Sequence, residues 1–253
     1  MKKLENKVAI ITGGAGSIGE TTAKLFLEEG AKVMLVDLNE EILKETIEKL
    51  NDKNVKYCVA DVSKSIDVAN YVNETVKAYG KIDVFFNNAG IEGIVKPIAD
   101  YPEEIFDKVI AVNVKGTWLG NKYVLPQMND GGSIIMTSSV AGINGSPNVS
   151  AYITSKHAVV GIMRATAVEG ATRKIRVNTV HPSPVDNRMM RSLEEGFSAG
   201  HAAEVKKNLE ATIPLGRYAE PIEIAKLVVF LASDDSQFIT GTTQVIDGGL
   251  SVQ

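Results

Sequence analysis

Short apolar runs alternate with amphipathic segments along the whole chain. Most of the runs lack polar alternation, which is typical of strands covered on both faces. The segments between them carry apolar residues at helical spacing. The pattern predicts strands at 8–11, 32–36, 55–59, 82–86, 133–136, 175–180 and 243–246, and helices at 17–30, 40–51, 65–79, 103–128, 151–171 and 221–233.

Strand, helix and strand repeated in this way predict an α/β fold, with a doubly wound, Rossmann-type parallel sheet flanked by helices. The 253 residues suit a single domain over 1–253. Residues 183–217 break the alternation and add a helical pattern after the sixth strand. Ligands bind beyond the carboxyl ends of parallel strands, so 183–217 is a candidate substrate lid, with a surface elaboration as the alternative.

Composition narrows the class of protein. Apolar residues make up 44% and charged residues 23%, with a net charge of −4, as in an ordinary globular protein. No basic stripe with interleaved aromatics is present, so we expect neither nucleic acid nor a membrane as a partner. The first apolar run, 8–11, is too short for a signal peptide or a membrane span, which favours a cytoplasmic location.

The cysteine and the histidines indicate no metal site. Cys58 is the single cysteine, and its apolar surroundings favour a buried structural role. The three histidines, His157, His181 and His201, are scattered without metal-ligand spacing, so we expect them to be structural or exposed.

A glycine-rich turn follows the first strand. Gly14, Gly16 and Gly19 fit the spacing G-x-G-x-x-G between a predicted strand and a helix. Glycines let the backbone approach a pyrophosphate, and a helix N-terminus offers free amides to it. The alternative is a turn that only reverses the chain. The context favours a dinucleotide site.

Asp37 ends the second predicted strand, where an acidic residue can bind the adenosine ribose hydroxyls and repel the extra phosphate of NADP. It predicts NAD as the cofactor. The alternative is a helix-capping aspartate, but Asn39 is also placed to cap the helix.

Tyr152 and Lys156 are four residues apart, on one face of a predicted helix. A nearby ammonium stabilises a phenolate and lowers the pKa of the tyrosine, which allows proton exchange with an alcohol. Such a pair alone also occurs by chance on exposed helices.

With these motifs the whole chain resembles the short-chain dehydrogenase/reductase family, in its single-domain form of about 250 residues. Thr12 to Gly19 resembles the family's T-G-x-x-x-G-x-G turn, and Asp61-Val62 its adenine-contacting pair. Further markers occur in family order: Asn87-Asn88-Ala89-Gly90, Asn113, Ser139 thirteen residues before Tyr152, and Asp247-Gly248-Gly249.

The resemblance implies a role for each matching residue. Tyr152 is the expected general acid/base, and Lys156 holds the nicotinamide ribose and lowers the tyrosine pKa. Ser139 binds the substrate oxygen, with Ser138 as the alternative, and Asn113 holds a water that links Lys156 to solvent. The expected cofactor-binding residues are Gly13, Ser17, Ile18, Gly19, Asp37, Asp61, Val62, Asn88, Ala89, Gly90, Tyr152, Lys156, Pro182, Val185 and Asn187.

Two departures from the family pattern concern cofactor contacts. Ser17 replaces the middle glycine of the turn, and its hydroxyl is able to contact a phosphate. After the sixth strand, Ser183 stands for a glycine and Asn187 for a threonine, which puts the nicotinamide contact of Asn187 in doubt.

We therefore expect an NAD-dependent oxidoreductase acting on a secondary alcohol or ketone. Methionines and other apolar residues at helical spacing in the lid (Met189, Met190, Leu193 and Phe197) suggest an apolar or cyclic substrate, or plain packing of the lid. A 3-oxoacyl-carrier-protein reductase is the alternative, with Arg173 and Lys174 as candidate docking residues. A non-catalytic NAD sensor is a third hypothesis, which the intact tetrad disfavours.

The family resemblance also implies a homotetramer, with the helix at 151–171 and the final strand as contacts. The apolar positions Val159, Ile162, Met163 and Ala167 fit such a buried face. They fit an intramolecular core equally well.

Overall fold

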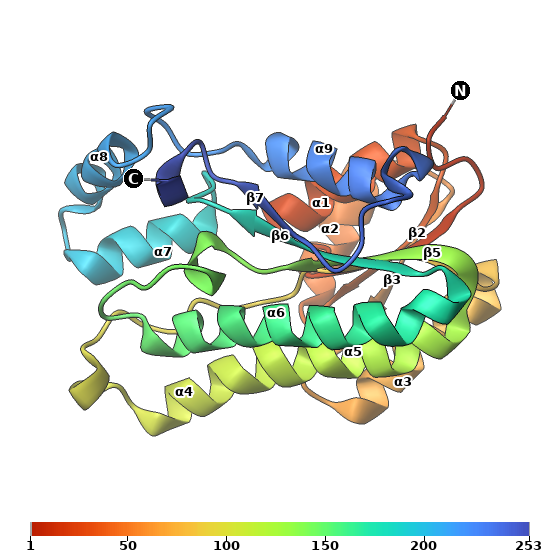
Figure 1. Ribbon diagram of the computed structural model, residues 1–253, viewed down its shortest axis with the longest axis horizontal. Coiled ribbons are helices and arrows are strands. Elements are labelled where there is room, and N and C mark those ends of the chain that lie inside the picture. Colours follow the sequence, from red (N-terminus) through yellow and green to blue (C-terminus); the bar gives the residue numbers. More distant parts are fainter. Residues whose placement is uncertain (1, 253) are drawn as a thin grey trace.

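A seven-stranded parallel sheet forms the centre of the molecule in the computed structural model, which describes residues 2–252. The strands lie in the order β3-β2-β1-β4-β5-β6-β7 (Figure 1). Their bounds are β1 Val8–Thr12, β2 Lys32–Asp37, β3 Val55–Val59, β4 Ile82–Asn87, β5 Met128–Thr137, β6 Arg176–Pro182 and β7 Thr243–Ile246.

The central strands are buried because helices cover both faces of the sheet. Every residue of β1 is buried, and so is every residue of β6. A continuous apolar strand is stable only where neither face meets water. The two edge strands differ, since Lys56 and Val59 of β3 and Val245 of β7 are exposed.

Three helices cover one face: α1 (Ser17–Glu28), α2 (Glu40–Leu50) and α9 (Pro221–Ala232) (Figure 1). Phe26 of α1 and Val228 of α9 are fully buried there against Ile11 of β1 and its neighbours. Burial of a large side chain contributes roughly 1.5–3 kcal/mol, so this layer holds α1 and the turn before it firmly on the sheet.

The other face carries α3 (Ser65–Tyr79), α4 (Glu103–Ile110), α5 (Thr117–Val124) and α6 (Ser150–Gly170). Val159, Met163 and Ala167 of α6 lie in the core beneath the sheet, and Ile162 packs against it. The apolar stripe of this helix is therefore intramolecular core.

The single helix predicted at 103–128 is divided in the structure. Residues Ala111–Gly116 form a π-helical turn between α4 and α5. A π turn inserts one extra residue per turn, and such insertions frequently mark functional sites. The hydrophobic pattern does not reveal it because both helices keep one buried face.

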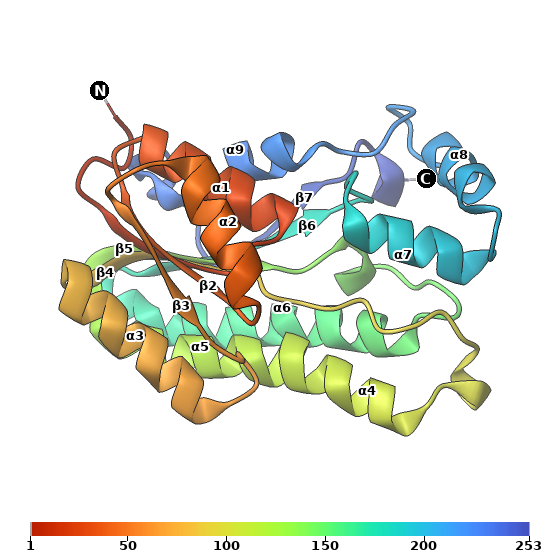
Figure 2. The same cartoon turned by 180° about the vertical axis from the view of Figure 1, so that it is seen from behind.

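From β1 to β3 successive strands are added toward one edge of the sheet, and from β4 to β7 toward the other, so the strand order reverses between β1 and β4. In a doubly wound sheet the ligand crevice lies at this point. Beyond the carboxyl ends of the strands lie α7 (Arg188–Phe197) and α8 (Ala202–Ala211), seen at the right of Figure 2. The segment 183–217 thus contains two helices, where the sequence predicted one helical pattern. Within residues 2–252 no helix is long and apolar enough to cross a membrane.

Candidate active site

The turn after β1 is shaped by its glycines. Gly13 has φ = 64°, in the left-handed region that favours glycine. A β-carbon on Gly19 would overlap the carbonyl oxygen of Gly13. The first turn of α1 therefore packs directly on the loop, and only glycine permits that approach.

The N-terminus of α1 points its free amides out of this turn. Gly16 caps the helix and offers no side chain to the first amides. Ser17 is exposed and Ile18 is partly exposed at the first two helical positions. Free amides and the partial positive charge of the helix end fit the pyrophosphate of a dinucleotide.

Asp37 lies at the carboxyl end of β2, beside the same turn. Its Oδ2 accepts a hydrogen bond from the backbone N–H of Ala15 (3.1 Å), and its Oδ1 accepts one from Leu38 (2.7 Å). Within residues 2–252 no lysine or arginine forms an ion pair with it. Asn39 caps α2 instead, through a bond from the Ile42 amide. The carboxylate is thus held in place beside the turn by backbone amides.

Asn88 ties three central strands together. Its Nδ2 donates to the carbonyl oxygens of Thr12 (3.2 Å) and Gly13 (3.4 Å), while its Oδ1 accepts from the Thr137 hydroxyl (2.9 Å). The Thr12 hydroxyl in turn accepts from the amides of Asn88 and Ala89. These bonds fix the floor of the crevice at the strand-order reversal.

Asp61 and Val62 follow shortly after the end of β3. Oδ1 of Asp61 accepts bonds from the backbone and the hydroxyl of Ser63 (3.0 and 2.6 Å), which form a tight local turn. Val62 packs against Gly116 at the end of the π turn, where a β-carbon would lie 2.9 Å from it.

Asn113 is buried inside the π turn and is held on both sides. Its Oδ1 accepts from the amide of Ile91 (2.8 Å), and its Nδ2 donates to the Ile91 carbonyl oxygen (2.9 Å). Nδ2 also donates to the hydroxyl of Ser155 (3.0 Å), which itself donates to the carbonyl oxygen of Tyr152. The asparagine therefore joins the loop after β4 to the helix that carries Tyr152.

Lys156 is only 3% exposed, one turn after Tyr152 on α6. Its Nζ donates to the carbonyl oxygen of Thr137 (2.9 Å) and lies 5.4 Å from the centre of the Tyr152 ring. A β-carbon on Gly90 would lie 3.4 Å from this Nζ and 3.3 Å from Oδ1 of Asn113. The bare backbone at Gly90 thus leaves room for a ligand over both polar groups.

Two adjacent serines have different environments. The Ser138 hydroxyl is buried and donates to the carbonyl oxygen of Lys156 (2.9 Å), so it serves the packing of α6. The Ser139 hydroxyl is partly exposed, accepts from the amide of Ala141 (3.1 Å) and lies close enough to the Tyr152 side chain to lower the pKa of its hydroxyl. Of the two serines, only Ser139 therefore faces Tyr152.

His181 holds the backbone of Ser139 in place. The sequence predicted only that this histidine is structural or exposed. It is fully buried in β6, and its Nδ1 donates to the Ser139 carbonyl oxygen (2.8 Å). Its Nε2 then accepts from the Thr179 hydroxyl (2.8 Å). Burial lowers the pKa of His181. The neutral ring fixes the backbone of the serine.

Burial shifts the pKa values of the central pair in opposite directions. It raises the pKa of Tyr152 to about 12, a shift that the Ser139 hydroxyl reduces and the charge of Glu92 increases. It lowers the pKa of Lys156 to about 8. The expected lowering of the tyrosine pKa is thus absent in the protein alone, because loss of solvent outweighs the stabilisation of the phenolate.

The segment after β6 reaches the site through its backbone. Pro182 offers its carbonyl oxygen to the Ser139 hydroxyl (3.5 Å). Val185 is buried and forms an isolated parallel bridge with Ala219. Oδ1 of Asn187 accepts from the amide of Met190 (3.1 Å) and caps α7. The side-chain oxygen of Asn187 is therefore engaged in capping α7.

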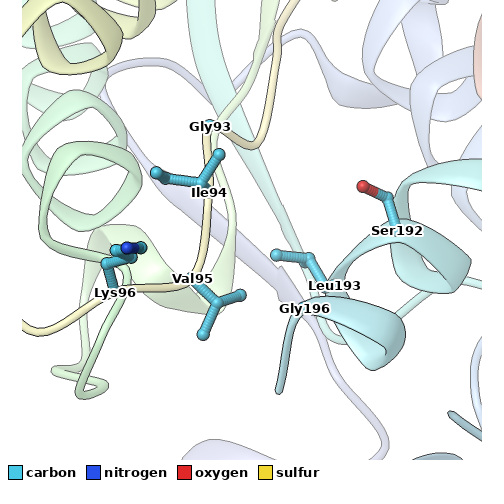
Figure 3. Close-up of a pocket in the computed structure, with 7 residues that line it drawn as sticks. All are labelled: Gly93, Ile94, Val95, Lys96, Ser192, Leu193 and Gly196. Atoms are coloured by element: carbon cyan, nitrogen blue, oxygen red, sulfur yellow. The ribbon is translucent and has the colours of Figure 1, made fainter. Parts of the chain in front are cut away.

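A cavity of about 260 Å³ lies between α7 and the residues after β4 (Figure 3). Gly93 to Lys96 line one side, and Ser192, Leu193 and Gly196 line the other. Met190 packs with Ile213 and Tyr218 in a separate small core. Of the apolar residues singled out in this part of the sequence, Leu193 borders the cavity and also packs against the small core, Met190 lies within that core, and Phe197 is 39% exposed.

Comparison with known proteins gives matches over the full length of the chain. A family model described as enoyl-(acyl carrier protein) reductase matches residues 13–251. Levodione reductase of Leifsonia aquatica is 38% identical, over 98% of this chain and 96% of its own. Its crystal structure superposes with a TM-score of 0.95, covering 98% of this chain and 99% of that one.

Other similar proteins act on several kinds of substrate, as their names state. Cyclohexanol dehydrogenase of an Acinetobacter species is 35% identical, over 97% of this chain and 95% of its own. The 3-oxoacyl-[acyl-carrier-protein] reductase of Thermotoga maritima is 39% identical, over 99% and 100%. The crystal structure of an NAD⁺-bound xylitol dehydrogenase has a TM-score of 0.91 and 35% identity, over 98% and 100%.

Proposed function

Because the chain belongs to the short-chain dehydrogenase/reductase family, we propose that it moves a hydride between NAD and a cyclic secondary alcohol or its ketone, with Tyr152, Lys156, Ser139 and Asn113 as its catalytic residues. It is an NAD-dependent oxidoreductase. The observation that carries the proposed roles is the convergence of the Ser139 hydroxyl and the buried Lys156 ammonium on the Tyr152 side chain.

The residues present fit a dinucleotide along the whole crevice. The glycine turn and the N-terminus of α1 suit the pyrophosphate, and Asp37 suits the adenosine ribose. Lys156, under the bare backbone of Gly90, suits the nicotinamide ribose. When bound, NAD would supply the hydride acceptor for oxidation of the alcohol, and NADH the hydride donor for reduction of the ketone.

The protein's own groups handle the proton. In alcohol oxidation the Tyr152 phenolate takes the hydroxyl proton of the substrate, and in ketone reduction the Tyr152 hydroxyl gives it back. The Ser139 hydroxyl donates to the substrate oxygen, where negative charge develops. Asn113, linked through Ser155 to the backbone of Tyr152, holds the helix in register with the loop after β4. We also propose that Asn113 holds the water expected from the sequence, which links Lys156 to solvent.

A cyclic alcohol is favoured by the similarity to cyclohexanol dehydrogenase and by the cavity under the lid, which Ile94, Val95 and Leu193 make largely apolar. We propose residues 183–217 as that lid. The test incubates purified protein with NAD and a panel of cyclic, linear and sugar alcohols, and follows NADH by absorbance. Turnover of cyclic secondary alcohols supports the proposal, and turnover of sugars alone contradicts it.

A carrier-protein reductase would need free basic residues for an acidic carrier. Arg173 is instead bound to the carbonyl oxygens of Leu125 and Met128 and to the carboxylate of Asp130. This engagement and the carboxylate of Asp37 favour the NAD-dependent alcohol dehydrogenase.

We propose a homotetramer formed through the outer faces of α4, α5 and α6 and through the edge strand β7. Exposed apolar side chains support this: Phe106 (37%), Trp118 (51%) and Val168 (77%) on the helices, and Val245 (43%) on β7. Light scattering of the purified protein tests the mass, and Val168→Glu should reduce it. We also propose the cytoplasmic location expected from the sequence, which cell fractionation tests.

A further inference from the structure

One buried carboxylate lies beside the proposed reacting centre and takes no part in the chemistry above. The Glu92 side chain is only 9% exposed. Its Oε1 accepts a hydrogen bond from Nη1 of Arg188 at 3.3 Å, and no other group of residues 2–252 donates to it. The Arg188 side chain is itself 77% exposed. A carboxylate that has lost most of its water and keeps one long bond has unused acceptor capacity.

The chain places Glu92 between the reacting centre and the cavity. The preceding residue, Ile91, is bound on both sides of its peptide by Asn113, next to the gap over Gly90. The following residue, Gly93, begins the lining of the cavity under α7 (Figure 3). The charge of Glu92 also raises the pKa of Tyr152, so the two side chains lie within electrostatic reach.

We propose that Glu92 binds a second hydroxyl group of the substrate, so that the enzyme prefers cyclic diols and their hydroxyketones to cyclic alcohols with one oxygen. This inference rests on the proposed function and specifies its substrate. A hydroxyl donates one hydrogen bond to the carboxylate without adding charge. A cationic donor is disfavoured, because Arg188 already places a positive charge at this carboxylate.

In the free protein, Arg188 is the hydrogen-bond partner of the Glu92 carboxylate. As the first residue of α7 it has an exposed side chain, and its one bond to the buried Glu92 carboxylate is long, at 3.3 Å. A substrate hydroxyl can therefore bind at the unused acceptor positions of the carboxylate while the guanidinium keeps its place. An alcohol without a second hydroxyl leaves Glu92 with only its original long bond and gains nothing from it.

The test compares kcat/KM for cyclohexanol with those for 1,2-, 1,3- and 1,4-cyclohexanediol, all with NAD. A hydrogen bond to a charged acceptor is worth about 10- to 100-fold in this ratio, and we expect at least one diol to be preferred by that factor. Glu92→Leu should bring the ratio close to one, and Glu92→Gln should give an intermediate value. Glu104→Gln, an exposed carboxylate on α4, is the matched control and should keep the parent ratio.

The outcomes separate this inference from the proposed function. Equal use of cyclohexanol and every diol by the parent overturns the role of Glu92 and leaves the alcohol dehydrogenase standing. A parent preference that persists in Glu92→Leu also overturns it. Inactivity toward all four alcohols contradicts both. Thermal unfolding confirms that each variant is folded, and the Gln variant carries the test if the Leu variant is not.

Discussion

The ammonium of Lys156 lies 5.4 Å from the centre of the Tyr152 ring, and it is anchored there by its bond to the Thr137 carbonyl oxygen. Desolvation moves their pKa values apart, from 10.0 to about 12 for the tyrosine and from 10.5 to about 8 for the lysine. The folded chain thus builds a desolvated acid/base pair before a ligand arrives.

Removing the Tyr152 hydroxyl should abolish most turnover and leave the fold intact. Loss of a general acid/base costs about 10²–10⁴ in rate, so we expect Tyr152→Phe to lower kcat by that factor with little change in Tm. Tyr57→Phe, on the edge strand β3, is the matched control, because its hydroxyl makes only one long surface contact to Glu40. Near-normal kcat in Tyr152→Phe would contradict the mechanism.

The pH dependence should differ between the two directions of reaction. Oxidation needs ionised Tyr152, whereas reduction needs its protonated form, and its pKa of about 12 keeps it protonated at neutral pH. Between about pH 6 and 8 the Lys156 ammonium stays protonated, since its pKa is about 8. In this range kcat/KM for oxidation should rise by up to about tenfold per pH unit, whereas kcat/KM for reduction should stay nearly constant. Initial rates in both directions test this, and a flat oxidation profile would refute it.

Burial of the Lys156 ammonium should lower the free energy of unfolding of the protein. At pH 7 the ammonium is charged in both the folded and the unfolded chain, and lowering its pKa from 10.5 to about 8 corresponds to a burial cost of about 3 kcal/mol. Lys156→Met removes this cost and loses the bond to Thr137, worth about 1 kcal/mol. The inactive variant should therefore be more stable than the parent at pH 7, by about 1–2 kcal/mol.

The pH dependence of stability in Lys156→Met tests the direction of the Lys156 pKa shift. Between about pH 8 and 10.5 the unfolded chain still binds the lysine proton and the folded chain has released it, so the parent gains stability as pH rises through this window. The stability advantage of Lys156→Met should shrink accordingly. Urea unfolding of both proteins at the two ends of the window measures it, and a variant less stable at pH 7 would contradict the burial cost.

Asp37 should make the enzyme prefer NAD to NADP. The extra phosphate would lie near the carboxylate, and each pair of unit charges at about 4 Å costs between about 1 and 4 kcal/mol. Together with the lost ribose hydrogen bonds, this gives a preference of about 30-fold or more in kcat/KM. Asp37→Ser should lose most of it, whereas Asp67→Ser, a carboxylate that accepts from the Asp61 amide outside this turn, should retain it. Equal use of both cofactors by the parent would overturn the assignment.

Hydrophobic periodicity predicted nearly every element, because a strand covered on both faces and a helix covered on one leave different patterns in the sequence. The predicted helix at 65–79 coincides with α3 (Ser65–Tyr79). The fifth strand was predicted at 133–136 and is Met128–Thr137, since its first half contains Asn129, Asp130 and two glycines at the exposed edge of the fold. The π turn at 111–116 left no pattern, because it changes the hydrogen bonding and not the buried face.

The spacing of Tyr152 and Lys156, the glycine turn and the position of Asp37 are local properties, so the sequence by itself determined the fold class, the cofactor and the residues around which the site is built. Which serine faces the centre, the support of Ser139 by His181, and the burial of Glu92 under Arg188 depend on strands and helices far apart in the chain. Only the tertiary structure decided these, because burial and hydrogen-bond partners exist only once those elements pack together.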